Sequence, residues 1–232
     1  MVHRILWRVA SEDALSFWAE RLADERVQAD GSVPGRLRFA DPEGLEHELV
    51  IDASGDDPLI AEHPQVPAEQ ALRGFDGVRA YAQDAEQSRP MLEQALAFEP
   101  SGDEWEVRGE RRGSTYAYDP PPSAGGIQGA GTVHHVAWAS PMDDHEAWRE
   151  RVLRSGGRPT PVIDRFYFKS VYFREPSGVL FELATIGPGF TTDEPAETLG
   201  QSLSLPPDYE HLRAQIEATV TPLPATRPVR AS

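Results

Sequence analysis

Residues 165–185 read RFYFKSVYFREPSGVLFELAT, which is two largely apolar segments joined by a Glu-Pro-Ser-Gly turn. The composition of each segment predicts a β-strand, and the glycine suits a turn position with positive φ. Residues 131–138 read GTVHHVAW and predict a further buried strand. His134, His135 and Glu182 thus offer imidazoles and a carboxylate on otherwise apolar strands. Such donors, with coordination positions left open, suit non-haem Fe(II), Mn(II) or Zn(II).

A copy of this pattern opens the chain. Residues 2–7 (VHRILW) match 133–138 (VHHVAW), and residues 37–49 (LRFADPEGLEHEL) match 171–183 (VYFREPSGVLFEL). A weaker copy begins with residues 75–81. Self-similarity of this length indicates a repeat architecture.

Each copy predicts a strand, an amphipathic helix and two or three further strands, in a mainly antiparallel sheet with helices on its outer face. Helices are expected near residues 14–22, 83–96, 146–153 and 208–218, with Ser11 and Asp143 as N-caps of the first and third. We expect a first repeat over residues 1–55, a middle repeat over 72–120, a last repeat over 131–190, and a C-terminal helix and tail over 191–232.

The composition limits the possible function classes. The 232 residues include no cysteine, which excludes disulfides, thiolate metal ligands and a cysteine nucleophile. The net charge of −16 argues against nucleic acid or an anionic membrane surface as partner. The sequence has no apolar run long enough to span a bilayer and no signal-peptide pattern, so we expect a cytoplasmic protein.

Four motifs occur in the order of one known family: GTVHHVAW, IDRFYFKSVYFREPSGVLFELAT, GPGFTTDEP and LGQSLSLPP. Through them the chain resembles the vicinal oxygen chelate superfamily of glyoxalases and extradiol dioxygenases, and most closely its hydroquinone-type ring-cleaving dioxygenases. The resemblance implies an α+β fold of βαβββ modules that form cupped, partly open, antiparallel-rich sheets. The family has four modules. The three repeats match the second, third and fourth, and the first module has no counterpart.

The resemblance also implies a site. His135 and Glu182 would be metal ligands, with Fe(II) as the expected ion and Mn(II) or Zn(II) as alternatives. A third ligand, a histidine of the first module, has no counterpart here. His134, Arg165 and Tyr172 match positions near the active site. Arginine can hold a phenolate, and tyrosine can donate to substrate or bound oxygen.

These residues also have plainer interpretations. A strand histidine is commonly structural, an arginine commonly ion-paired at the surface, and a tyrosine commonly part of a core. In a regular strand His134 would face the opposite side from His135, and only a bulge would bring it to the site as an acid or base.

Three function classes stay open. The first is a metal-dependent dioxygenase that cleaves hydroquinone- or catechol-type aromatics with dioxygen, either as a chain shortened at its N-terminus, and then inactive alone, or as one completed by another polypeptide. The second is a glyoxalase-like metalloenzyme completed by dimerisation, and the third is a non-catalytic binding protein. The expected partners are a small aromatic substrate, dioxygen, and either a second copy or a chain that supplies the missing module.

Three structural expectations follow. His135 and Glu182 should converge from neighbouring strands. Arg4 and Glu48, which align with them in the first repeat, should form an ion pair; the middle repeat has Gly77 at the histidine position. The first two repeats should pair with each other, which would leave the inner face of the last repeat open to water, with Val136, Trp138, Phe173, Leu180 and the two ligand positions on it.

Overall fold

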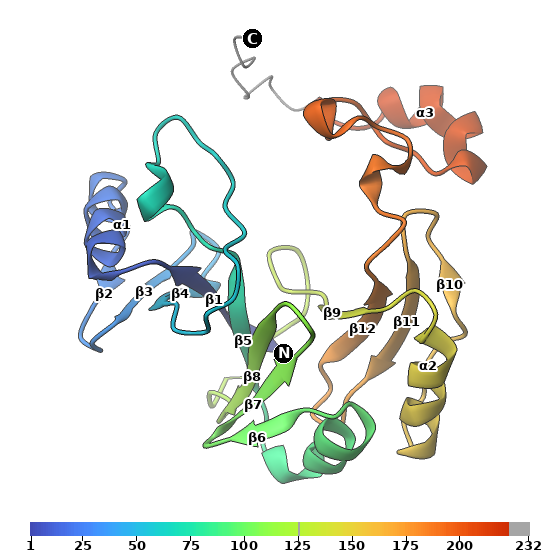
Figure 1. Cartoon of the computed structure of the whole chain (residues 1–232), viewed down its shortest axis with the longest axis horizontal. Helices are drawn as coiled ribbons and strands as arrows, with labels where there is room; N and C mark the ends of the chain where they lie inside the picture. The colour runs from blue at the N-terminus through green and yellow to red at the C-terminus, as the bar shows by residue number, and fades with distance from the viewer. Residues whose placement is uncertain (125, 223–232) are drawn as a thin grey trace.

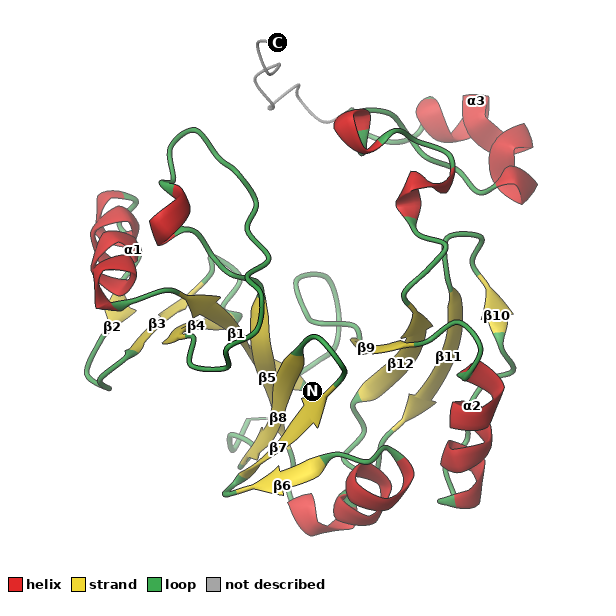
Figure 2. Ribbon diagram, in the orientation of Figure 1, coloured by secondary structure: helices red, strands yellow, loops and turns green. Residues whose placement is uncertain are grey.

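The protein has a mixed α+β fold built on two open sheets (Figures 1 and 2). A computed structural model describes residues 1–124 and 126–222, so the end of the predicted tail lies outside the described residues. The expected fold class is confirmed. Among the described helices, none is both long and apolar enough to cross a membrane.

The eight-stranded sheet contains the strands of the first and middle repeats. In spatial order they are β2 (Ala29–Asp30), β3 (Arg36–Ala40), β4 (Glu46–Ile51), β1 (Val2–Val9), β5 (Phe75–Tyr81), β8 (Gly113–Asp119), β7 (Glu104–Arg108) and β6 (Glu99–Ser101). The four-stranded sheet contains those of the last repeat: β10 (Ile163–Asp164), β11 (Lys169–Arg174), β12 (Leu180–Thr185) and β9 (Val136–Ser140).

One topology occurs three times. In each repeat the opening strand pairs in parallel with the closing strand, as β1 with β4, β5 with β8 and β9 with β12. The other pairs within each repeat are antiparallel hairpins. β1 and β5 join the first two repeats antiparallel, as expected. The corresponding edge of β9 is unpaired within the described residues.

Two helices cover the outer faces of the first and last repeats. α1 (Glu12–Asp24) begins at Ser11, whose side chain accepts a hydrogen bond from the Ala14 amide and so confirms the predicted N-cap. α2 (His145–Arg154) extends one residue beyond each end of the predicted range 146–153. Its N-cap is Asp144 rather than Asp143, and this side chain makes no capping hydrogen bond.

The predicted helix over 83–96 is broken in the structure. It consists of a 3-10 turn, Ala85–Gln87, and a π-helical segment, Pro90–Ala95. Pro90 has no amide hydrogen and cannot continue a helix from the preceding turn. The C-terminal helix is likewise a 3-10 helix, Pro207–Leu212, that runs into the short α3 (Arg213–Glu217). Further 3-10 turns are Ala68–Gln70, Phe190–Thr192 and Ala196–Thr198.

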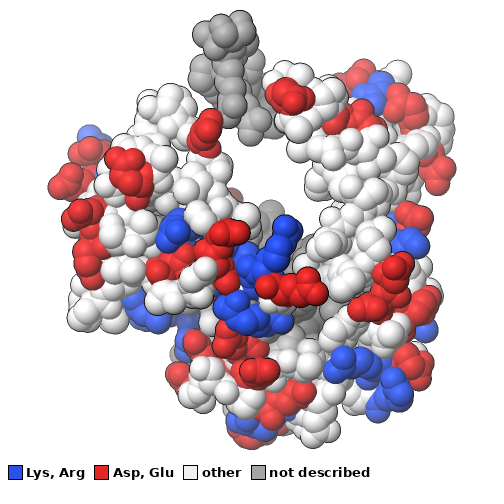
Figure 3. Space-filling model, viewed as in Figure 1, with Lys and Arg blue, Asp and Glu red and all other residues white. Residues whose placement is uncertain are grey.

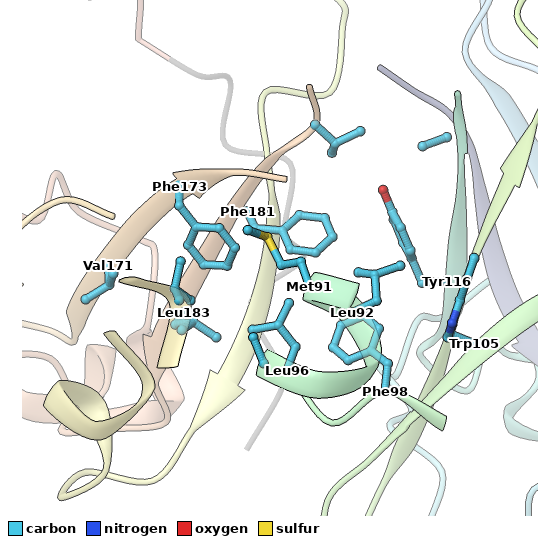
Figure 4. Close-up of a cluster of buried hydrophobic side chains, with 14 of the residues drawn as sticks. Met91, Leu92, Leu96, Phe98, Trp105, Tyr116, Val171, Phe173, Phe181 and Leu183 are labelled. Carbon is cyan, nitrogen blue, oxygen red and sulfur yellow. The ribbon is translucent and has the colours of Figure 1, made fainter. Parts of the chain in front are cut away.

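The main core lies between the two sheets, with the π-helical segment wedged into it (Figure 4). Met91 and Leu92 of this segment, and Leu96 directly after it, are buried in this core. The eight-stranded sheet contributes Trp105 and Tyr116, and the four-stranded sheet contributes Val171, Phe173, Phe181 and Leu183. A second cluster packs α1, including Leu15 and Trp18, on the first repeat.

This core corrects one expectation. Phe173 is buried, and Val136 and Trp138 are half-buried against the main cluster, so they are not open to water. Glu182 pairs with Ala137, whereas Phe181 pairs with Val136 and Leu183 with Trp138. Because strand side chains alternate between faces, these apolar residues lie on the face opposite the ligand positions. Of the residues named, only half-buried Leu180 shares the ligand face.

Candidate functional site

His135 and Glu182 meet on the open face of the four-stranded sheet. Glu182 pairs with Ala137 of β9, and His135 lies two residues earlier, directly before the strand. Their side chains therefore lie on one face. Nε2 of His135 lies 2.8 Å from Oε2 of Glu182. The imidazole is 32% exposed and the carboxylate 4%, so the site opens to solvent on the histidine side.

Ser170 completes the environment of the carboxylate. Its buried hydroxyl donates a hydrogen bond to Oε1 of Glu182 over 2.5 Å. Ser170 lies in the stretch 165–185 but is not among the site residues predicted from the sequence. Strand alternation could have indicated its place at the site, because Ser170 lies two residues before Tyr172 and so on the same strand face.

His134 contacts His135 through the ring edges. The two Nδ1 atoms lie 2.9 Å apart, and the rings are nearly perpendicular. His134 does not point away because both histidines precede the regular part of β9, where the alternation of a strand does not apply. The contact occupies Nδ1 of His135 and leaves Nε2 facing Glu182.

Tyr172 lies on the same sheet face as Glu182, and Arg165 contacts the Tyr172 ring. Tyr172 pairs directly with Glu182 across β11 and β12, and its ring packs edge-on to His135 with centroids 5.8 Å apart. The exposed Arg165 guanidinium lies 5.6 Å from the centre of the Tyr172 ring, within the range of a cation–π contact. All five residues selected from the sequence are thus brought together, although their chemical roles stay predictions.

The pair fits two positions of a divalent metal. Two donor atoms about 2.1 Å from one ion, at right angles to each other, lie about 3.0 Å apart. The 2.8 Å between Nε2 of His135 and Oε2 of Glu182 is close to this separation. The parts of the chain that the structure describes contain no group of three or more His, Asp or Glu able to hold a metal.

The first repeat holds an ion pair at the matching place. Glu48 pairs with Leu6, and Arg4 lies two residues before it, as His135 does before Ala137. Nη1 of Arg4 lies 3.2 Å from Oε2 of Glu48, which confirms the expected pair. Arg36 and Arg38 contact the same fully buried carboxylate at 2.6 and 3.0 Å. Burial alone would raise the pKa of Glu48, but the guanidiniums outweigh it and lower the pKa.

The middle repeat carries no donor at either place. Arg79 pairs with Ala117, so Ala117 occupies the position of Glu182, and Gly77 occupies that of His135. Gly77 lies tight against β8. A Cβ atom there would overlap the carbonyl oxygen and Oγ1 of Thr115.

The chain is similar to proteins of one known superfamily. Residues 74–183 match the Glyoxalase/Bleomycin resistance protein/Dioxygenase superfamily. Two proteins of Bacillus subtilis (strain 168), both provisionally named as ring-cleaving dioxygenases, are similar over most of the chain. MhqA is 36% identical over 236 residues, with 93% of this chain and 74% of MhqA covered. MhqO is 34% identical over 222 residues, with 92% and 71% covered.

Two further similarities extend the comparison. Chlorohydroquinone/hydroquinone 1,2-dioxygenase of Sphingobium indicum is 30% identical over 225 residues, with 89% of this chain and 68% of that protein covered. The crystal structure of a Bacillus subtilis protein, provisionally described as a dioxygenase, superposes with a TM-score of 0.85 at 34% identity. That match covers 99% of this chain and 75% of the other.

Proposed function

Because the chain belongs to the Glyoxalase/Bleomycin resistance protein/Dioxygenase superfamily, we propose that it is a metal-dependent dioxygenase that cleaves hydroquinone- or catechol-type rings. The observation that carries the proposal is the convergence of His135 and Glu182 at 2.8 Å on an open sheet face. The hydroquinone dioxygenase named among the relatives supports the substrate class. Dioxygen would add both its atoms as the ring opens between a hydroxylated carbon and its neighbour.

Each site residue would have a separate role, set by its position. Nε2 of His135 and Oε2 of Glu182 would hold the ion, with Fe(II) favoured over Mn(II) or Zn(II). When bound, the ion would supply Lewis acidity and an electron path between substrate and dioxygen. Arg165, exposed beside the Tyr172 ring, would hold an ionised substrate hydroxyl. Tyr172 would donate a hydrogen bond to the reacting oxygen, and His134 would pass a proton to or from the substrate.

We propose that a third metal ligand comes from a strand of a second copy of the chain or of another polypeptide. That strand would pair antiparallel with β9, as β5 pairs with β1. The sheet edges support this proposal. Three of the four edge strands have only two or three residues, namely β2, β6 and β10. β9 has five residues, Val-Ala-Trp-Ala-Ser, and no charge. Long uncharged edges invite pairing with another strand.

The exposed side chains of β9 support the same proposal. In the space-filling view, an open hollow separates the loop after the first repeat from the C-terminal segment (Figure 3). Ala137 and Ala139 of β9 are exposed on the ligand face. A second copy of the chain, or another polypeptide with a βαβββ module, would supply the strand. Light scattering with metal analysis tests this, and a monomer that holds stoichiometric iron and cleaves the ring would contradict it.

Metal binding and oxygen uptake test the function. Purified chain loaded with Fe(II) without oxygen should bind one equivalent. The metal-bound form should then consume oxygen in a one-to-one ratio with hydroquinone or catechol. His135→Ala and Glu182→Ala should lose the metal, while the matched control His211→Ala, an exposed histidine in the C-terminal segment, should keep it. A metal-bound form that takes up no oxygen with either substrate would refute ring cleavage.

A further inference from the structure

We infer that Ser170 is a positioning residue that turns the Glu182 carboxylate so that a single oxygen, Oε2, is presented beside His135. The inference rests on the proposed metal site. The side chain of Ser170 contacts the carboxylate of Glu182, so it would act through that ligand and not on the substrate itself. Three features carry the inference: the register of β11 and β12, the burial of the hydroxyl, and the asymmetry of the carboxylate contacts.

The register places Ser170 diagonally across from Glu182. Ser170 pairs with Ala184, and Tyr172 pairs with Glu182, so all four side chains lie on the ligand face. The methyl group of Ala184 leaves room for the carboxylate to lean toward Ser170. The diagonal neighbour is within reach because glutamate is long.

The burial of the hydroxyl fixes its direction. Ser170 is fully buried, and a buried hydroxyl requires a hydrogen-bond partner. The serine hydroxyl donates to the carboxylate oxygen beside it. The hydroxyl thus has one strong acceptor, Oε1 of Glu182, at 2.5 Å.

The two carboxylate oxygens consequently differ. Oε1 holds the serine hydroxyl inside the sheet, and Oε2 faces Nε2 of His135 at 2.8 Å. Without Ser170 the carboxylate could rotate, and Oε1 would lose its partner in a buried setting. Groups that orient a metal ligand in this way commonly change metal affinity by about 10- to 100-fold when they are removed.

Titration with Co(II) tests the inference on the full chain. Ser170→Ala should bind Co(II) at least about 10-fold more weakly than the wild type, because the ligand carboxylate is no longer held. Ser170→Thr, which keeps the hydroxyl, should restore most of the affinity. Ser140→Ala is the matched control, because Ser140 is a buried serine of the same sheet whose hydroxyl contacts His145. It should bind as the wild type does.

A crystal structure of metal-free Ser170→Ala provides a readout that does not depend on binding. It should show the Glu182 side chain rotated away from His135 in an otherwise unchanged sheet. An unmoved carboxylate with wild-type Co(II) affinity would overturn the inference and leave the proposed function standing. Co(II) affinity that survives both His135→Ala and Glu182→Ala would instead overturn the ligand assignment, and the inference with it.

Discussion

The Tyr118 hydroxyl donates a 2.6 Å hydrogen bond to Oε2 of Glu175 and so ties the two sheets together. Tyr118 belongs to β8 of the large sheet, and Glu175 opens the turn between β11 and β12. The carboxylate is buried and also accepts hydrogen bonds from the Ser88 hydroxyl and from the amides of Ser177 and Val179. Burial raises the pKa of Tyr118 well above its usual range, and Glu175 adds to this, so the phenol stays a donor.

Removal of the Tyr118 hydroxyl should weaken the packing of the two sheets against each other. Tyr118→Phe should lower the free energy of unfolding by roughly 1.5–3 kcal/mol, the usual range for a hydrogen bond to a charged group. Urea unfolding measures this loss. Tyr81→Phe, a half-buried tyrosine on β5 that stacks on His3, is the control. A double-mutant cycle with Glu175→Gln should show coupling, and strictly additive losses would contradict the assigned role.

Neutralisation of Glu48 should destabilise the first repeat. Glu48→Gln leaves Arg4, Arg36 and Arg38 gathered around a buried amide, and loss of one partner of a buried pair costs about 3–5 kcal/mol. We expect about 2–4 kcal/mol, because Arg36 and Arg38 can turn to water. Glu46→Gln is the matched control, since Glu46 also binds Arg4 but is 44% exposed, and it should cost less than about 1 kcal/mol. Equal losses in the two variants would contradict this account.

Stability should depend on pH through Asp119. The hydrogen bond from Arg79 lowers the pKa of Asp119 to about 2, from a usual value of 3.8. Because the folded-state pKa is depressed, the contribution to stability is fully present above the unfolded value and is lost as the pH falls toward about 2. Asp119→Asn should therefore cost about 1–2 kcal/mol at pH 7 and roughly half as much at pH 3.

Urea unfolding at a series of pH values measures this dependence. In an Arg79→Gln background, the Asp119→Asn substitution should show a weaker pH dependence, since the main cause of the shift is absent. A cost that stays constant between pH 7 and pH 3 in the wild-type background would rule out the Asp119–Arg79 pair as its source.

The Tyr172 hydroxyl should act in catalysis and not in metal binding. Tyr172→Phe keeps the ring contacts with His135 and Arg165 but removes the donor, so kcat should fall by roughly 100-fold with unchanged metal content. Steady-state oxygen uptake and metal analysis measure the two effects. Tyr167→Phe is the control, because that hydroxyl contacts Asp193 and Ser204. Loss of metal in Tyr172→Phe would show that the hydroxyl supports the site and not the reaction.

Local sequence patterns predicted much of the fold. The Glu-Pro-Ser-Gly turn and the apolar segments beside it predicted β11 and β12, and their short hairpin fixed the register that sets Tyr172 opposite Glu182. The repeat alignment predicted the contact of Arg4 with Glu48, because equal spacing in equal topology gives equal geometry. The two ligand candidates converge for the same reason.

Other features depend on packing that no local pattern contains. Tyr118 and Glu175 are 57 positions apart and meet only when the two sheets pack, so no local pattern indicates their contact. The prediction of an exposed inner face was wrong because Phe173 and Leu180 were assigned to one face, although the strand alternation separates them. The helix predicted over 83–96 ran across Pro90, a residue that cannot continue a helix from the turn before it, and the structure is broken there.

Gly77 determines which of the repeats could gain a metal ligand by mutation. Any side chain at this position would overlap the Thr115 backbone, so a histidine could enter β5 only after the strand had separated from β8. The first repeat differs, because Arg4 already fills its position with a large side chain beside Glu48. A single nucleotide change can convert arginine to histidine. A single substitution of Arg4 could therefore create a second His–Glu pair in the first repeat. In the middle repeat, the backbone of Thr115 prevents the matching substitution of Gly77.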